Sequence, residues 1–187
     1  IQAGCGRTGG FFSFEEAGIT PDIVTLAKSL SGMGLPFALA LLRPELDQWR
    51  PGEHNGTFRG NCHAFVTATA ALRHFWRDGA FERTVRQRAD QLSRRLHAIA
   101  APYGDQMRVK GRGMMLGIDV GSGEIAARIT AAAFARGVII ETSGAHDEVV
   151  KVLAPLTISE AELSQGLRIL EQCVALAVAP RYSAAAE

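Results

Sequence analysis

The stretch Pro21-Asp22-Ile23-Val24-Thr25-Leu26-Ala27-Lys28 places a lysine directly behind a short apolar run. An apolar segment of this length that follows a turn signal predicts a buried β-strand over Ile23–Ala27. A lysine at the exit of such a strand is partly removed from water, which raises the fraction of neutral, nucleophilic amine. Only three of the 20 basic residues are lysines, so Lys28 is the first candidate for covalent chemistry. From spacing alone, a lysine whose amine reaches from the strand end into solvent remains the alternative.

The segments on either side of this strand are rich in glycine. Upstream, Gly4-x-Gly6-x-x-Gly9 has the form of a dinucleotide fingerprint, but the preceding strand and following helix that this motif needs are missing. Downstream, a second apolar run at Phe37–Leu42 precedes a polar loop over Arg50–Gly60. That loop presents hydroxyl, amide and N–H groups just before a helix N-terminus, which is a favourable place for a phosphate. A simple capping loop is an equally good interpretation.

Two helices are predicted after this loop. Asn61 is suited to cap the first helix, which would run to about Asp78. The second helix begins near Phe81 and has a single apolar stripe with arginines away from it, which predicts a core-packed helix with a solvated basic face. The stripe consists of Phe81, Val85, Ala89, Leu92, Leu96 and Ile99.

Beyond residue 103, short strands alternate with helices, which is typical of an α/β unit. Strands are predicted over 114–120, 138–141 and 149–153, and helices over 124–136 and 159–177, while Lys110 lies in a polar segment over 108–112 that reads as surface. Ser159 and Glu162 have capping-box spacing. We therefore expect the α/β class, with a first part over residues 1–103, a small α/β domain over 104–180 and a tail over 181–187.

Composition excludes several classes of protein. The 20 basic and 19 acidic residues leave a net charge of +1, and 47% of the chain is hydrophobic, which gives no support to a nucleic-acid binder. We expect no membrane span, because no apolar run approaches the roughly 20 residues that one needs. Three separate cysteines and no recognisable signal peptide favour a cytoplasmic protein. The histidines and cysteines lack metal-ligand spacing, so no metal site is expected.

Five segments occur in an order that is more specific than any one of them. They are Gly4-Cys5-Gly6-Arg7-Thr8-Gly9, Pro21–Lys28, Gly56-Thr57-Phe58-Arg59-Gly60-Asn61, Lys110–Ile118 and Lys151–Ile158. Together they resemble the class III aminotransferases, which use pyridoxal 5'-phosphate. The resemblance extends to about residue 180 and favours a catalytic role for Lys28. It implies the C-terminal half of a fold type I enzyme, with the remainder of the large cofactor domain over 1–103 and the small domain behind it.

The resemblance also implies roles for individual residues. Lys28 would bind the cofactor covalently and then move a proton during the reaction. Gln2 would lie near the phenolic oxygen of the cofactor, and Thr57 would reach the cofactor phosphate of the neighbouring subunit, so that a homodimer shares its active sites. Lys151 would contact the substrate, at a position where many members carry an arginine. A lysine lacks the bidentate geometry of that arginine, so the substrate contact should differ.

The implied reaction transfers the amino group of L-glutamate to L-aspartate 4-semialdehyde, giving L-2,4-diaminobutyrate and 2-oxoglutarate. One alternative is another ω-aminotransferase, acting on ornithine, acetylornithine or GABA. A second is a non-catalytic remnant, and a third, disfavoured by the net charge, is nucleic-acid binding by the arginine-faced helix. In this family, an Asp-Glu pair and the phosphate loop would precede the position of Ile1. We therefore expect this chain by itself to be inactive.

Overall fold

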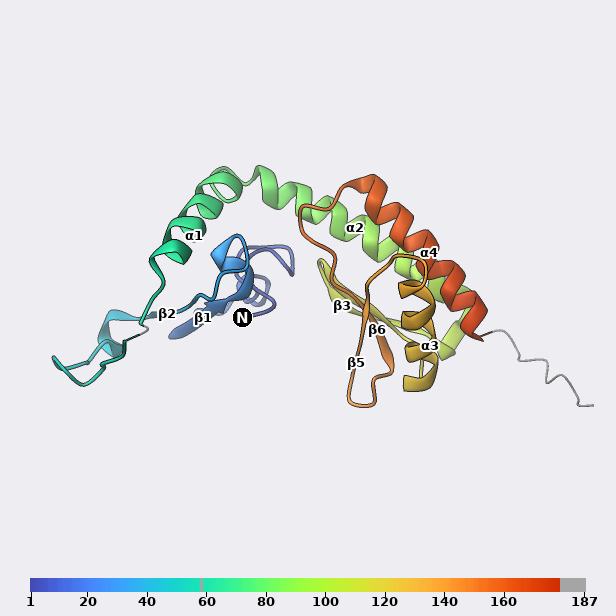
Figure 1. Ribbon diagram of the computed structural model, residues 1–187, viewed down its shortest axis with the longest axis horizontal. Coiled ribbons are helices and arrows are strands. Elements are labelled where there is room, and N and C mark those ends of the chain that lie inside the picture. The colour runs from blue at the N-terminus through green and yellow to red at the C-terminus, as the bar shows by residue number, and fades with distance from the viewer. Residues whose placement is uncertain (58, 179–187) are drawn as a thin grey trace, which may run out of the picture. The chain divides into compact units, whose positions relative to one another are not determined.

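The computed structural model describes residues 1–57 and 59–178 of the chain. It divides into two compact units, one over Ile1–Arg86 and a second that begins at Gln87. Helices and strands occur in both units, which confirms the α/β class (Figure 1). The predicted tail over 181–187 and the last two residues of the predicted small domain lie outside the described residues. Within the described residues, no helix is both long and apolar enough to cross a membrane.

The first unit contains a two-stranded antiparallel sheet. It pairs β1 (Ile23–Ala27) with β2 (Ala38–Leu42), so that Ile23 faces Leu42 and Ala27 faces Ala38. Strand β1 has the bounds that the sequence predicts. Short 3-10 helices lie in the connections, namely η1 (Glu15–Ala17), η2 (Lys28–Ser31) and η3 (Pro44–Leu46). The core of this unit consists of Cys5, Leu26 and Leu30, with Phe11, Phe12, Val24, Phe37 and Leu39 packed against them.

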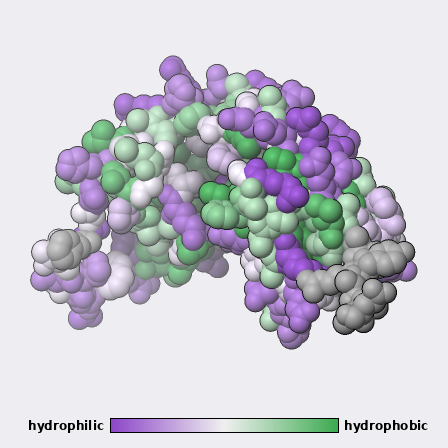
Figure 2. Space-filling model, turned by 45° about the vertical axis from the view of Figure 1, so that its right-hand side comes forward, coloured by the Kyte–Doolittle hydropathy of each residue, from purple (hydrophilic) through white to green (hydrophobic). Residues whose placement is uncertain are grey.

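Strand β1 is not buried, contrary to the prediction. Ile23 is 55% exposed, and Leu26 is the only residue of the strand that is buried. The physical reason is that β1 and β2 pair only with each other, and the Cys5–Leu30 cluster covers part of that small sheet. Hydrophobic side chains therefore reach the surface, and Figure 2 shows several hydrophobic patches on the face that it draws. An apolar strand sequence indicates suitability for burial, but it does not supply the layer that buries the strand.

The first long helix is capped as predicted. In α1 (Cys62–Phe75), the Asn61 Oδ1 accepts hydrogen bonds from the backbone N–H groups of His63 at 3.0 Å and Ala64 at 3.3 Å. The helix ends before the predicted Asp78, because the carboxylate of Asp78 accepts the N–H of Ala80 at 3.0 Å. Asp78 therefore belongs to the start of the next helix.

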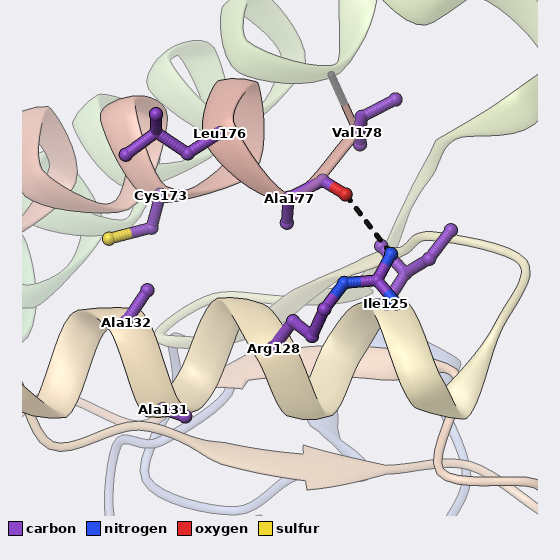
Figure 3. Close-up of a pocket in the computed structure, with 8 residues that line it drawn as sticks. All are labelled: Ile125, Arg128, Ala131, Ala132, Cys173, Leu176, Ala177 and Val178. Carbon is purple, nitrogen blue, oxygen red and sulfur yellow. Dashed lines mark hydrogen bonds between the residues drawn. The ribbon is translucent and has the colours of Figure 1, made fainter. Parts of the chain in front are cut away.

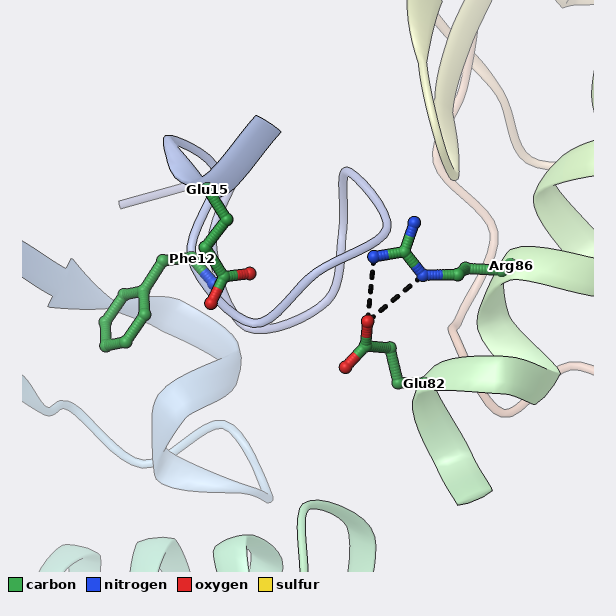
Figure 4. Close-up of polar contacts among 4 residues, drawn as sticks. All are labelled: Phe12, Glu15, Glu82 and Arg86. Atoms are coloured by element: carbon green, nitrogen blue, oxygen red, sulfur yellow. Dashed lines mark hydrogen bonds and ion pairs between the residues drawn. The ribbon is translucent and has the colours of Figure 1, made fainter. Parts of the chain in front are cut away.

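Helix α2 (Ala80–Ala100) carries the predicted apolar stripe, and five of its six positions are buried, from Val85 to Ile99. Near its start, Arg86 donates from Nε and Nη2 to Glu82 Oε1 at 3.0 and 2.8 Å, which raises the pKa of Arg86 (Figure 4). A Cβ on Gly9 would lie 3.7 Å from Arg86 Nη1. The guanidinium therefore lies against the N-terminal glycine loop, where Glu15 accepts the N–H of Phe12 at 3.4 Å.

The second unit is built on a four-stranded antiparallel sheet with the order β3-β4-β6-β5. The strands are β3 (Arg108–Arg112), β4 (Met115–Asp119), β5 (Glu141–Ser143) and β6 (Val149–Val152). Helices α3 (Gly123–Phe134) and α4 (Glu160–Val178) lie side by side, and α3 packs on strands β5 and β6 (Figure 1). The 3-10 helix η4 (Ala101–Gln106) leads into β3. Buried residues of the sheet include Leu116, Ile118, Val150 and Val152.

Two elements of this unit differ from the sequence-based expectation. The segment Arg108–Arg112 is largely exposed, as expected, but it forms an edge strand paired with β4. The strand predicted over 138–141 begins only at Glu141, because the residues before it close helix α3. The N–H of Val138 donates to Ala133 O at 3.0 Å and the N–H of Gly137 to Phe134 O at 2.9 Å, as in a Schellman-type helix end.

The capping box at the start of α4 is confirmed. Ser159 Oγ accepts the N–H of Glu162 at 3.2 Å, and the Glu162 carboxylate accepts the N–H of Ser159 at 3.1 Å. The hydroxyl of Ser159 also donates to this carboxylate at 2.6 Å, and these bonds lower the pKa of Glu162. The reciprocal pairing fixes the first turn of the helix.

The core of the second unit gives a stability test on one helix. Leu170 is 1% exposed and Leu176 is 60% exposed, and both lie on α4. We expect Leu170→Ala to lower the free energy of unfolding by about 2–5 kcal/mol, since it removes buried methyl groups and leaves a cavity. The control Leu176→Ala should cost less than about 0.5 kcal/mol. Urea unfolding measures both, and equal losses in the two variants would contradict this packing.

Candidate active site

The backbone turns sharply at Lys28, where β1 ends. Lys28 has a φ of 55°, a left-handed conformation that costs a non-glycine residue about 1–2 kcal/mol. The turn is held from inside, because the carbonyl of Lys28 accepts the hydroxyl of Ser31 at 3.3 Å. Ser31 is fully buried, and its Oγ accepts the N–H of Gly34 at 3.1 Å. These bonds fix the direction in which the Lys28 side chain leaves the strand.

Helix α1 sets the position of this turn. Gly32, at the end of η2, has a φ of 80°, and a Cβ there would lie 2.7 Å from Ala71 Cβ and 3.0 Å from Thr67 O. Only glycine fits both the conformation and the close approach. The segment after Lys28 is therefore packed directly on the backbone of α1.

The side chain of Lys28 borders an open hollow of about 540 Å³. The other lining residues are Ser29, Gly32, Gly34, Leu35, Pro36 and Phe37. Lys28 is exposed, so the predicted partial removal of its amine from water is wrong for the described residues, because β1 is itself uncovered. Within those residues the structure gives this amine no hydrogen bond or ion pair. An uncommitted primary amine at the rim of a hollow is suited to covalent chemistry with a carbonyl group.

The N-terminal glycine loop packs on the same turn through Cys5. Burial raises the pKa of the Cys5 thiol, and a hydrogen bond with Ser29 partly opposes that shift. The hydroxyl of Thr8 donates to Ala3 O at 3.0 Å, which closes the loop. Gln2 lies exposed at the beginning of this loop. The contact between Cys5 and Ser29 thus connects the segment that carries Gln2 with the turn that carries Lys28.

A second hollow, of about 450 Å³, shares two residues with the first. Pro36 and Phe37 line both, and Arg59, Gly60 and Asn61 line the second with Ala38. The ring of Phe37 packs edge-on against Phe65 of α1 at 5.4 Å between centroids. A Cβ on Gly60 would collide with the same Phe65 ring. The start of β2 therefore separates the Lys28 hollow from the loop before α1.

The loop before α1 offers fewer anion donors than the sequence suggested. Asn61 already occupies the N–H groups of His63 and Ala64, so these two amides are not available to a phosphate. The capping interpretation holds for them. Thr57 is exposed, and Arg59 donates to His54 O at 3.4 Å, while Phe58 lies outside the described residues. An anion at this loop would rely on the Thr57 hydroxyl and the Arg59 guanidinium.

Lys151 belongs to the second unit and is described within it. Its ammonium lies 2.9 Å from Glu141 Oε2 on the neighbouring strand β5. Lys151 stands between the buried Val150 and Val152 on β6, so its side chain points away from the core that these valines face. Lys151 could be singled out from the sequence but its acidic partner could not, because local spacing does not show which strands pair.

A second lysine of this sheet is also ion-paired. Lys110 Nζ lies 2.7 Å from Asp119 Oδ2, and the N–H of Gly121 donates to Asp119 Oδ1 at 2.9 Å. The hydrogen bond from Lys110, followed by that from Gly121, lowers the pKa of Asp119. The alternation Arg108-Val109-Lys110 was a strand signal that could have revealed this pair.

A separate hollow of about 600 Å³ lies between α3 and α4 (Figure 3). Its lining is largely apolar and includes Cys173, Leu176 and Ile125, and Arg128 donates to Ala177 O at 3.1 Å. It has no carboxylate or amine in its lining that could take part in group transfer. Nor does any trio of metal-ligating side chains occur in the part of the chain that the structure describes.

The sequence matches the family Aminotransferase class-III over residues 1–174. The chain belongs to the class-III aminotransferases. It is 61% identical to the diaminobutyrate–2-oxoglutarate transaminase of Halomonas elongata, over 91% of this chain and 41% of that protein. It is 54% identical to the transaminase of the same name from Vibrio parahaemolyticus, over 99% of this chain and 44% of that protein. The chain thus spans about two fifths of the length of these curated relatives.

The fold agrees with this family. The crystal structure of N-acetylornithine aminotransferase from Stenotrophomonas maltophilia matches with a TM-score of 0.78 and 30% identity, over 94% of this chain and 45% of that one. Class-III aminotransferases depend on pyridoxal 5'-phosphate. The described residues fit two groups of this cofactor, since Lys28 offers a free amine for an aldehyde, and Thr57 and Arg59 offer donors for a phosphate. Neither hollow is lined by a carboxylate for the ring nitrogen.

The Lys110–Asp119 pair of this aminotransferase predicts a pH-dependent stability. A lowered pKa stabilises the folded state fully above the ordinary aspartate value of 3.8, and this contribution is lost as the pH falls through the folded value. Asp119→Asn keeps the acceptor for Gly121 but removes the ion pair. We expect it to lower the free energy of unfolding by about 1 kcal/mol at neutral pH, and by less at about pH 3.

Urea unfolding at the two pH values measures the difference. The control is Glu171→Gln, which removes the exposed ion pair of Glu171 with Arg95 at 3.0 Å and should cost less than about 0.5 kcal/mol at both. A cost for Asp119→Asn that does not change with pH would contradict the assignment.

Proposed function

We propose that this chain serves the transfer of an amino group from L-glutamate to L-aspartate 4-semialdehyde, which yields L-2,4-diaminobutyrate and 2-oxoglutarate. The observation that carries the proposal is the uncommitted amine of Lys28, held on a fixed turn at the rim of a hollow. The names of the relatives support the substrates. Glutamate is the amine that corresponds to 2-oxoglutarate, and the semialdehyde is the carbonyl compound that corresponds to diaminobutyrate.

Lys28 would provide both the covalent attachment and the proton transfer. When bound, pyridoxal phosphate supplies an aldehyde that takes up the amino group and a ring that withdraws electrons from the reacting carbon. The Nζ of Lys28 would hold this cofactor, release it to the incoming amine, and then carry a proton from the Cα of the substrate to the C4′ carbon of the cofactor. The held backbone at Lys28 supports this role, because the amine has to stay within reach of both carbons between which the proton moves.

Gln2 would contact the cofactor beside Lys28, and Thr57 would contact the cofactor of the neighbouring subunit. We propose that the Thr57 hydroxyl donates to the phosphate of a neighbouring subunit in a homodimer, and that Gln2 lies near the phenolic oxygen. The exposure of Thr57 supports a role toward a group outside the described chain. The contact of Cys5 with Ser29 supports the placement of the Gln2 loop near the Lys28 turn.

Lys151 would bind a carboxylate of the substrate. Its ammonium is a compact positive charge with three donors, without the planar fork of an arginine. We further propose that residues 1–103 form part of the large cofactor domain and residues 104–180 the small domain of a cytoplasmic enzyme. The chain alone should be inactive, in line with the two fifths of its relatives' length that it spans.

Replacement of Lys28 tests the proposal in the full-length protein that contains this chain. Lys28→Ala should lower glutamate-dependent formation of diaminobutyrate about a thousandfold or more, because it removes both the attachment and the proton carrier. Product formation is measured by mass spectrometry. Borohydride reduction, which makes a lysine–cofactor bond permanent, should mark the peptide that contains Lys28 in the parent protein and none in the variant.

Lys110→Ala is the matched control, because Lys110 is another lysine that already has a partner. It should keep the cofactor label. Preferred turnover of ornithine, acetylornithine or GABA would contradict the substrate assignment. Retained turnover in Lys28→Ala would contradict the catalytic role of Lys28. A full-length protein with neither turnover nor cofactor label would contradict the proposal that it is an aminotransferase.

A further inference from the structure

The hydroxyl of Ser31 is buried inside the turn that follows Lys28, and its hydrogen bonds both go to the backbone of that turn. Ser31 has no exposed surface. Its Oγ donates to the Lys28 carbonyl at 3.3 Å and accepts the N–H of Gly34 at 3.1 Å. A buried hydroxyl needs such partners to offset its removal from water. Ser31 therefore ties the first residue of the turn to the last.

The alternation along β1 shows where Lys28 would point without this turn. Val24 and Leu26 face the apolar cluster of the first unit, and Leu26 is buried in it. Successive side chains of a strand point to opposite faces, so residues two apart share a face. If β1 continued as a strand, Lys28 would share the face of Leu26 and would meet the apolar cluster. The left-handed turn at residue 28 instead directs this side chain to the rim of the hollow.

The two bonds of Ser31 are of the right size to decide between these conformations. A left-handed non-glycine residue is unfavourable by an amount similar to the net contribution of one or two hydrogen bonds. The next left-handed residue, Gly32, has a φ of 80° and carries no such cost. The unfavourable conformation is thus confined to Lys28, whose carbonyl accepts the Ser31 hydroxyl. Without that hydroxyl, the extended conformation of Lys28 would compete with the observed one.

We propose that Ser31 is a positioning residue, whose hydroxyl holds Lys28 in the conformation that presents its amine to the hollow. This inference rests on the proposed function, in which Lys28 is the residue that reacts. Ser31 would touch neither the cofactor nor the substrate and would act only through the backbone of Lys28. Its loss should therefore slow the proton transfer by Lys28 and leave the binding of glutamate unchanged.

Ser31→Ala in the full-length protein tests this by amide hydrogen exchange without added cofactor. The informative amide is that of Gly32, which donates to Ser29 O at 3.0 Å and has no bond to the Ser31 side chain. Its exchange reports the opening of the turn, and it should become about five- to thirtyfold faster when the two bonds are lost. Mass spectrometry with fragmentation of the peptide measures this single amide.

Turnover supplies the second measurement on the same variant. With cofactor, the kcat for L-glutamate should fall about three- to tenfold, because the amine spends less time in reach of the reacting carbons. The KM for L-glutamate should stay within about twofold of the parent value. A loss that was only structural would lower the amount of folded enzyme, whereas this split is expected at equal concentrations of folded protein.

Two variants serve as controls. Ser31→Cys keeps a side chain of similar size but has a much weaker donor and acceptor, so it should behave like Ser31→Ala, and it replaces that variant if alanine prevents folding. Thr69→Ala removes another hydroxyl that donates to a backbone carbonyl, that of Phe65 at 2.7 Å on α1. It should change neither the exchange of Gly32 nor turnover.

The outcomes separate this inference from the proposed function. Unchanged Gly32 exchange in Ser31→Ala would overturn the positioning role, and so would parent-like exchange and turnover in Ser31→Cys, which would make the role of Ser31 one of packing. A rise in KM in place of a fall in kcat would also overturn it. Faster Gly32 exchange in a full-length protein that transfers no amino group would uphold the hold on the turn and contradict the proposed function alone.

Discussion

The first unit depends on one unfavourable backbone conformation, the left-handed turn at Lys28. This conformation costs free energy for a residue with a Cβ, so the surrounding structure must offset it. Ser31 does so from inside the turn by donating to the Lys28 carbonyl, and Gly32 does so by packing on the backbone of α1. Because both contacts come from residues just after Lys28, the lysine cannot relax into a continuation of β1 without detaching η2 from α1. The contact between η2 and α1 therefore maintains the left-handed conformation of Lys28.

The same helix also shapes the neighbouring hollow. Phe65 of α1 packs on Phe37 and approaches Gly60 closely, so the wall between the two hollows and the loop that ends in Asn61 share one aromatic contact. Asn61 in turn fixes the first amides of α1. The turn that follows Lys28 and the loop that ends in Asn61 therefore both contact the same helix, α1.

Features that depend on neighbouring residues in sequence could be predicted, and features that depend on distant partners could not. The bounds of β1, the Asn61 cap, the capping box at Ser159 and the buried stripe of α2 follow from local spacing, and the structure has all of them. The burial of β1 could not be read in this way, because it requires a covering layer that a strand does not encode. The strand predicted over residues 138–141 begins only at Glu141 for a related reason. The N–H of Val138 donates to the end of helix α3, so it does not take part in the sheet. The sequence marks Lys28 and Lys151 as candidates for chemistry, but the exposed rim around Lys28 and the acidic partner of Lys151 depend on three-dimensional contacts that local spacing does not show.

The ammonium of Lys151 keeps hydrogen-bond donors beyond the one that it gives to Glu141. The ammonium has three donors that point in different directions, so it can hold one oxygen of Glu141 at 2.9 Å and still offer donors to a second carboxylate. A guanidinium that binds a carboxylate with its fork uses two donors in one plane, which fixes one partner in one orientation. The cross-strand register of β5 and β6 keeps Glu141 opposite Lys151, and the low exposure of Lys151 limits the directions from which another anion can approach. Lys151 and Glu141 are therefore best understood as one cross-strand pair.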